Sequence, residues 1–201
     1  MNRIKIMLLS LMVAMTPVVW GQTSAVPMLE QAANQIIDTL KANRSKLKTD
    51  HAVIHQAVER YLLPHVDLAG MSRSVLGRTS WSQASAAEKK EFTQVFTQLV
   101  VRTYATPLAE YSGETVTFSP QQDAASAGRF TRVNSVIKRT NGQVIPLSYA
   151  LVSKDGSWKV YDLSVEGVSL LQSFRNQFSQ VLQKSSMKAL ILQMQQHGTA
   201  A

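Results

Sequence analysis

The hydrophobic pattern of the chain changes its period once, near Gly113, and no other feature limits the fold as strongly. Before this point, apolar residues recur every three or four positions, as they do on the buried face of a helix. After it, they alternate with polar residues, as they do in a strand with one buried face. The sequence therefore predicts an α+β fold, in which helices cover one face of a curved antiparallel sheet of about four strands.

The helical part of the chain, residues 26–111, is divided by glycine, proline and capping residues. The predicted helices cover residues 26–45, 48–64, 65–77 and 85–111. Gly77 suits the C-terminal end of the third helix, because glycine adopts the left-handed conformation there without a steric penalty. Ser85 and Glu88 form a capping box at the start of the fourth helix, and Pro107 should bend or end it.

The sheet part, residues 114–166, is divided by turn residues. The predicted strands cover residues 114–120, 128–140, 143–153 and 157–167. Asn141-Gly142 predicts a two-residue hairpin turn, and Lys154-Asp155-Gly156 predicts another. The last three strands should therefore form an antiparallel meander.

Alternation also predicts which side chains share a face of the sheet. In the third strand, the residues on one face are Ile145, Leu147, Tyr149 and Leu151. In the fourth strand, Trp158 and Val160 should lie opposite Tyr161, Leu163 and Val165. A strongly apolar face has to be covered by helices. Glu166 and Gly167 are the predicted corner from the sheet into the C-terminal helices, residues 167–196, because glycine permits a close turn.

The N-terminus and the charge suggest where the chain works. Arg3 and Lys5 precede a short apolar run, and Gly21 is a small residue at a plausible cleavage site, so residues 1–21 are predicted to be a signal peptide. Residues 22–201 would then be one exported domain. The absence of cysteine excludes disulfides and thiolate sites and is consistent with the bacterial periplasm. Export argues against nucleic acid as the counterpart of the net charge of +8, which leaves anionic membrane surfaces, acidic protein partners or solubility alone.

Catalytic and metal-binding patterns are weak. His51, His55 and Glu59 share a helix face, but no HExxH motif is present, so we expect a solvated face and no metal site. Asp155, Asp162 and Glu166 could be paired carboxylates, yet the chain has no GxSxG motif and no cysteine nucleophile. We predict no catalytic residues.

Three segments carry a resemblance to a known family: "MSRSVLGR", "FTQVFTQLVVRTYATPLAEY" and "WKVYDLSVEGVSLLQSFRNQF". Together they resemble the MlaC family, the periplasmic phospholipid-binding component of the Mla lipid-asymmetry (toluene-tolerance) transport system. The resemblance implies an NTF2-like sheet and a hydrophobic pocket between sheet and helices that holds acyl chains, with a phospholipid as cargo and no other cofactor. It also implies two partners, an inner-membrane ABC transporter complex and an outer-membrane lipoprotein–porin complex.

The predicted wall of this pocket consists of apolar and aromatic residues from the fourth helix, the sheet and the C-terminal helices. They are Phe96, Tyr104, Leu108, Val116, Phe118, Ile145, Leu147, Tyr149, Val160, Leu171, Phe174 and Phe178. Two alternatives stay open at this point. One is an NTF2-like enzyme that uses the pocket as a reaction chamber, and the other is a lipid-free periplasmic adaptor with a solid core.

Overall fold

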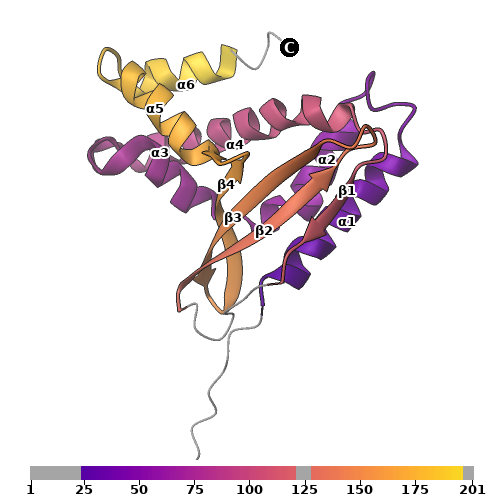
Figure 1. Cartoon of the computed structure of the whole chain (residues 1–201). Helices are drawn as coiled ribbons and strands as arrows, with labels where there is room; N and C mark the ends of the chain where they lie inside the picture. Colours follow the sequence, from indigo (N-terminus) through magenta and orange to yellow (C-terminus); the bar gives the residue numbers. More distant parts are fainter. Residues whose placement is uncertain (1–23, 121–127, 197–201) are drawn as a thin grey trace, which may run out of the picture.

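The computed structural model describes residues 24–120 and 128–196, except for the side chains of Tyr104 and Thr106 (Figure 1). The predicted signal peptide, residues 1–21, lies outside the described residues. The elements follow one another as α1 Val26–Ala42, α2 Ala52–Tyr61, the short 3-10 helix η1 Leu63–His65, α3 Leu68–Gln83, α4 Ala86–Ala109, β1 Thr115–Phe118, β2 Phe130–Lys138, β3 Val144–Lys154, β4 Ser157–Val165, β5 Val168–Ser169, α5 Leu170–Leu182 and α6 Met187–Gln196. The predicted α+β class is confirmed.

The strands form one antiparallel sheet in the order β1-β2-β3-β4-β5, so each strand pairs with its neighbour in the chain. α1 runs along one face of the sheet, as Figure 1 shows, and buries Leu29 against Leu151 and Trp158. α3 and α5 pack against β4. The two-residue strand β5 was not predicted, because it is too short to show alternation.

The three hairpin turns of the described sheet differ in their geometry. Asp155 and Gly156 have φ angles of 48° and 76°, and Glu166 and Gly167 have φ angles of 51° and 84°, as two-residue hairpin turns require. The predicted two-residue turn at Asn141-Gly142 is wrong. The Gly142 N–H donates to the carbonyl of Arg139 and the Arg139 N–H to that of Gln143, so this loop has three residues, with only its last one, Gly142, in the left-handed region (φ 87°).

A β-bulge in β4 changes which side chains share a face. Leu151 pairs with Val160, but the preceding Ala150 pairs with Asp162, so Tyr161 is an extra residue. The bulge shifts the alternation by one position. Trp158 and Val160 therefore lie on the same face as Leu163 and Val165. The prediction that they lie on the face opposite Leu163 and Val165 is wrong.

Gly77 divides α3 into two helical stretches. Its φ and ψ angles of 74° and 166° are not helical, yet the helix resumes and continues to Gln83. A helical stretch therefore ends at Gly77, as predicted, but the second stretch up to Gln83 was not predicted. The resumed part brings Trp81 against the core formed by α3 to α6, so tertiary packing favours a second helical stretch.

The buried core consists of separate clusters, and the long helix α4 links two of them. Its N-terminal half carries Phe92 and Phe96, which pack with α3, α5 and α6. Its C-terminal half carries Val101 and Ala105, which pack with α1 and α2. The capping box predicted for its start is present, with the Glu88 N–H donating to Ser85 Oγ.

Asp67 fixes α3 to the sheet. Its Oδ1 accepts a hydrogen bond from the Gly70 N–H at 3.0 Å, as an N-cap does, and lies 2.7 Å from Lys154 Nζ at the end of β3. Its own N–H donates to the carbonyl of Val160. The carboxylate side chain is only 11% exposed, so these contacts replace most of its hydration.

Replacing Asp67 with alanine is expected to lower the free energy of unfolding by about 1–3 kcal/mol, because it removes a helix cap and a charge-assisted hydrogen bond. Urea denaturation followed by circular dichroism would measure this change. Asp38→Ala is the matched control, since the Asp38 carboxylate is 75% exposed and lies 3.8 Å from Lys41. That variant should change stability by less than about 0.5 kcal/mol, and equal effects of both variants would contradict the role of Asp67.

Candidate functional site

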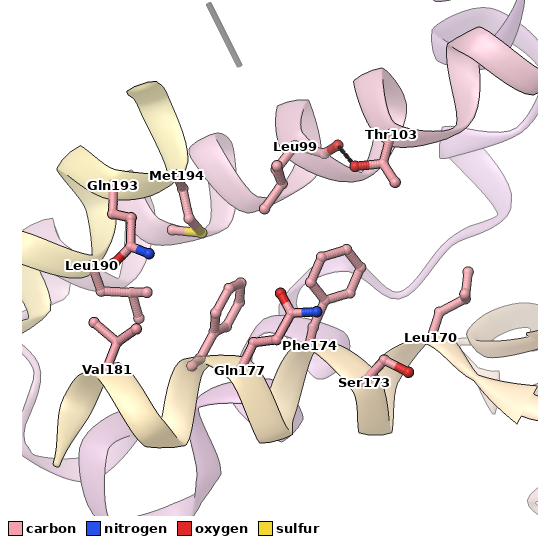
Figure 2. Close-up of a pocket in the computed structure, with 11 residues that line it drawn as sticks. Leu99, Thr103, Leu170, Ser173, Phe174, Gln177, Val181, Leu190, Gln193 and Met194 are labelled. Carbon is pink, nitrogen blue, oxygen red and sulfur yellow. Dashed lines mark hydrogen bonds between the residues drawn. The ribbon is translucent and has the colours of Figure 1, made fainter. Parts of the chain in front are cut away.

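A cavity of about 390 Å³ lies among α4, α5 and α6. Figure 2 shows side chains of α4 and α6 facing those of α5 across this space. The lining residues are Leu99, Thr103, Leu170, Ser173, Phe174, Gln177, Phe178, Val181, Leu190, Gln193 and Met194. Their character is largely apolar, with uncharged polar groups interspersed and no charged side chain among them. Such a lining suits a neutral apolar ligand.

The sequence of α5 accounts for its place in this wall. Leu170, Phe174, Phe178 and Val181 are spaced by three or four residues and so share a helix face. The start of the helix is fixed by Asp162 in β4, whose carboxylate accepts hydrogen bonds from Ser169 Oγ at 2.6 Å and from the Leu171 N–H at 3.1 Å. Asp162, considered above as an acid–base group, therefore has a structural role in positioning α5.

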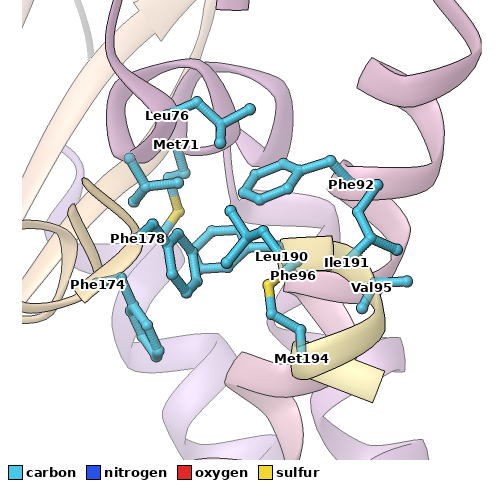
Figure 3. Packing of buried hydrophobic residues seen from close by; sticks show 11 residues of the cluster. Met71, Leu76, Phe92, Val95, Phe96, Phe174, Phe178, Leu190, Ile191 and Met194 are labelled. Carbon is cyan, nitrogen blue, oxygen red and sulfur yellow. The ribbon is translucent and has the colours of Figure 1, made fainter. Parts of the chain in front are cut away.

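Phe174 and Phe178 line the cavity and also belong to the buried core. Figure 3 shows them within the cluster where α3, α4, α5 and α6 meet. The ring of Phe96 lies edge-to-face on Phe174 and Phe178, with centroids 5.3 and 5.9 Å apart, and is stacked on Phe92 at 5.7 Å. Aromatic rings packed in this way form a rigid floor beneath the cavity.

The apolar face of the sheet packs against α1 at one end, and its other end lies outside the described core clusters. Val133, Leu151 and Val160 pack against α1. Leu147 is 9% exposed, and its neighbours Val116 and Ile145 on the same face are half-buried. Within the part of the chain that the structure describes, none of these last three belongs to a core cluster. This end of the face therefore carries apolar side chains outside the described core clusters, and Leu147 among them is buried.

Two polar groups lie on the same face. Ser135 is 1% exposed, and its Oγ lies 3.4 Å from the hydroxyl of Tyr149. Burial raises the pKa of the Tyr149 phenol, so the group stays neutral and keeps its hydrogen near neutral pH. The face is thus uncharged as well as apolar.

The residues predicted for the pocket wall are distributed over several places. Phe174 and Phe178 line the cavity, with Phe96 and Leu171 in the core cluster beside it. Leu108 packs in the cluster of α1, α2 and α4.

The predicted wall residues of the sheet do not line the cavity. Phe118, Tyr149 and Val160 pack with α1, whereas Val116, Ile145 and Leu147 lie at the other end of the sheet face, outside the described core clusters. The side chain of Tyr104 is outside the described part. Glu166 and Gly167 form the turn between β4 and β5.

Sequence reasoning missed the contribution of α6. Leu190 and Met194 line the cavity, and together with Met187 and Ile191 they recur at helical spacing. That spacing predicts a buried helix face. It does not reveal that the face is shared between the core and a cavity, because this depends on α4, nearly a hundred residues earlier in the chain.

The described residues contain neither a cluster suited to a metal ion nor a membrane-spanning helix. Within residues 24–120 and 128–196, no three His, Asp or Glu side chains come together as a metal site would require. None of the helices described here is long and apolar enough to cross a membrane.

The comparisons with known proteins converge on one family. The model of the MlaC protein family matches residues 30–196. The intermembrane phospholipid transport system binding protein MlaC of Haemophilus influenzae is 30% identical over 88% of this chain and 83% of its own length. The toluene tolerance protein ttg2D of Pseudomonas putida is 27% identical over 78% of this chain and 72% of its own length.

A solved structure gives the same result for the fold. The phospholipid-binding protein of Ralstonia solanacearum, solved in complex with a phospholipid at 1.53 Å resolution, superposes with a TM-score of 0.80. Its sequence is 25% identical, and the match covers 88% of this chain and 98% of that one.

Proposed function

The chain belongs to the MlaC family, and from this premise we propose that it is a periplasmic carrier that binds a phospholipid by its acyl chains. The carrier shuttles the lipid between the outer and inner membranes and so maintains the asymmetry of the outer membrane. The observation that carries the proposal is the phospholipid bound by the Ralstonia solanacearum protein, whose fold this chain shares at a TM-score of 0.80. Export of residues 22–201 as one domain is part of the same proposal.

The acyl chains would occupy the cavity among α4, α5 and α6 together with the end of the sheet face around Leu147. A volume of about 390 Å³ is near the lower end of the range for small-ligand sites, roughly 300–1,000 Å³, and a diacyl lipid needs more space. Leu147 and its apolar neighbours on the sheet would supply the additional surface. Leu170 lines the cavity and directly follows β5, whose Val168 pairs with Val165, the partner of Leu147 in β4.

The energetics favour a carrier over a permanent lipid store. Burying about 30 methylene groups at ~0.8 kcal/mol each would give about 24 kcal/mol relative to water. This exceeds the practical limit of roughly 18–21 kcal/mol for non-covalent binding. The relevant reference is therefore the bilayer, where the tails are already in an apolar environment. Transfer between bilayer and protein is then nearly balanced, and the lipid can be released.

The direction of lipid transport has to come from partner proteins. The sequence contains no GxxxxGK[ST] loop with which to bind ATP. An inner-membrane ABC transporter complex and an outer-membrane lipoprotein–porin complex would supply it, and no catalytic step by this chain is needed.

Refilling of the delipidated chain tests binding by the tails. The chain is mixed with phosphatidylglycerol in detergent, the detergent is removed, and lipid phosphorus per chain is measured. We expect lipid to be retained, and an excess of glycerophosphoglycerol, which has the headgroup without acyl chains, should not displace it. Displacement would contradict binding by the tails, and a chain that retains no lipid would favour the adaptor alternative.

A further inference from the structure

A second cavity, of about 670 Å³, lies between α3 and the sheet face opposite α1. It shares no lining residue with the cavity among α4, α5 and α6. We call it the arginine cleft, and its lining residues are Asp67, Gly70, Arg73, Ser74, Gly77, Arg78, Trp81, Ser82, Arg129, Phe130, Val152, Lys154, Tyr161 and Arg175. The carrier function proposed above does not use it.

The cleft concentrates positive charge from separate elements. Its arginines are Arg73 and Arg78 of α3, Arg129 just before β2, and Arg175 of α5. The lining contains a single carboxylate, that of Asp67, and its Oδ1 is paired with Lys154 Nζ at 2.7 Å. Across residues 24–120 and 128–196, the structure gives none of these arginines a carboxylate partner. Like charges around a concave surface focus a positive potential within it.

The break at Gly77 contributes to this arrangement. Arg73 and Arg78 are five residues apart, which in an uninterrupted helix would point them roughly 140° apart around the axis. The non-helical angles of Gly77 lie between them and reorient the second half of α3. Both arginines can thereby line the same cleft.

The cleft also offers aromatic surface. Trp81, Phe130 and Tyr161 are part of its lining, and Phe130 is 56% exposed. The Phe130 ring lies edge-to-face on Tyr161, with centroids 5.9 Å apart, so it is held in place although it faces solvent. Arginine, tryptophan and tyrosine are the residues that most often dominate binding energy at protein interfaces.

We propose that the arginine cleft docks an acidic segment of a partner protein, one in which carboxylates flank an apolar side chain. The carboxylates would pair with the guanidinium groups, which match their planar geometry. The apolar side chain would cover Phe130. A free phosphate would satisfy the arginines and leave Phe130 exposed, and a flat bilayer surface would not fill a concave cleft.

A short fluorescein-labelled peptide with glutamates around a phenylalanine tests the proposal by fluorescence anisotropy. A matched peptide has glutamine in place of each glutamate. We expect the acidic peptide to bind the wild-type chain at low salt, and Arg73→Glu with Arg175→Glu to weaken binding by about tenfold or more. Lys184→Glu with Lys188→Glu makes the same change of charge at exposed positions outside the cleft and should leave affinity within about twofold.

Several results would overturn the proposal. They are absence of binding by the acidic peptide, equal binding of the glutamine peptide, and equal loss in both double variants. Co-sedimentation with phosphatidylglycerol vesicles that depends on Arg73 and Arg175, without peptide binding, would assign the cleft to a membrane surface instead. Lipid phosphorus is measured on the same samples. The cleft variant should keep its lipid, and this readout separates failure of the docking proposal from failure of the carrier proposal.

Discussion

Replacing Leu147 with arginine is expected to reduce the phospholipid bound per chain by at least about tenfold, with the fold retained. Leu147 points from the centre of β3 to the apolar sheet face, where it is 9% exposed and outside every described core cluster. A guanidinium placed against acyl chains loses hydration without gaining a partner, which costs several kcal/mol. Because Leu147 is buried, circular dichroism of the lipid-free variant checks that the fold is retained.

Val136→Arg is the control for this variant. Val136 lies on the neighbouring strand β2, on the opposite sheet face, and is 37% exposed. It should keep its lipid, as measured by phosphorus content after purification without detergent. Unchanged lipid content in a folded Leu147→Arg chain would show that the tails do not contact this face.

Replacing Phe96 with alanine is expected to lower the free energy of unfolding by about 3–5 kcal/mol. The Phe96 side chain is 1% exposed and contacts the rings of Phe92, Phe174 and Phe178. Its removal leaves a void at the point where α3, α4, α5 and α6 meet. Aromatic pairing is lost in addition to apolar burial.

The matched change is Phe130→Ala, because Phe130 is 56% exposed and lies outside the core clusters described. It should alter stability by about 0.5 kcal/mol or less. Urea denaturation curves of both variants and the wild type give the comparison. A loss below about 1 kcal/mol for Phe96→Ala would mean that the aromatic floor collapses freely around the void, so it could not serve as a rigid cavity wall.

The features that the sequence predicts correctly depend on residues that are close together in the chain. The capping box at Ser85 and Glu88 and the turn at Asp155-Gly156 depend on side chains and backbone angles a few residues apart. Periodicity likewise predicts the apolar stripe of α5, because helix geometry alone determines which of its residues share a face.

The features that were missed depend on tertiary structure. The bulge at Tyr161 adds one residue to β4, and strict alternation contains no sign of it. The continuation of α3 beyond Gly77 depends on the packing of Trp81 against distant helices. The cavity is lined by three helices, so no single stripe of residues predicts it.

Mass spectrometry of the chain purified from periplasm without detergent, first under native and then under denaturing conditions, tests the central claim most directly. The account predicts a native mass increased by that of a diacyl phospholipid, with the increment lost on denaturation. A native mass equal to that of the bare chain, unchanged after incubation with phosphatidylglycerol vesicles, would contradict a carrier that binds lipid by its tails.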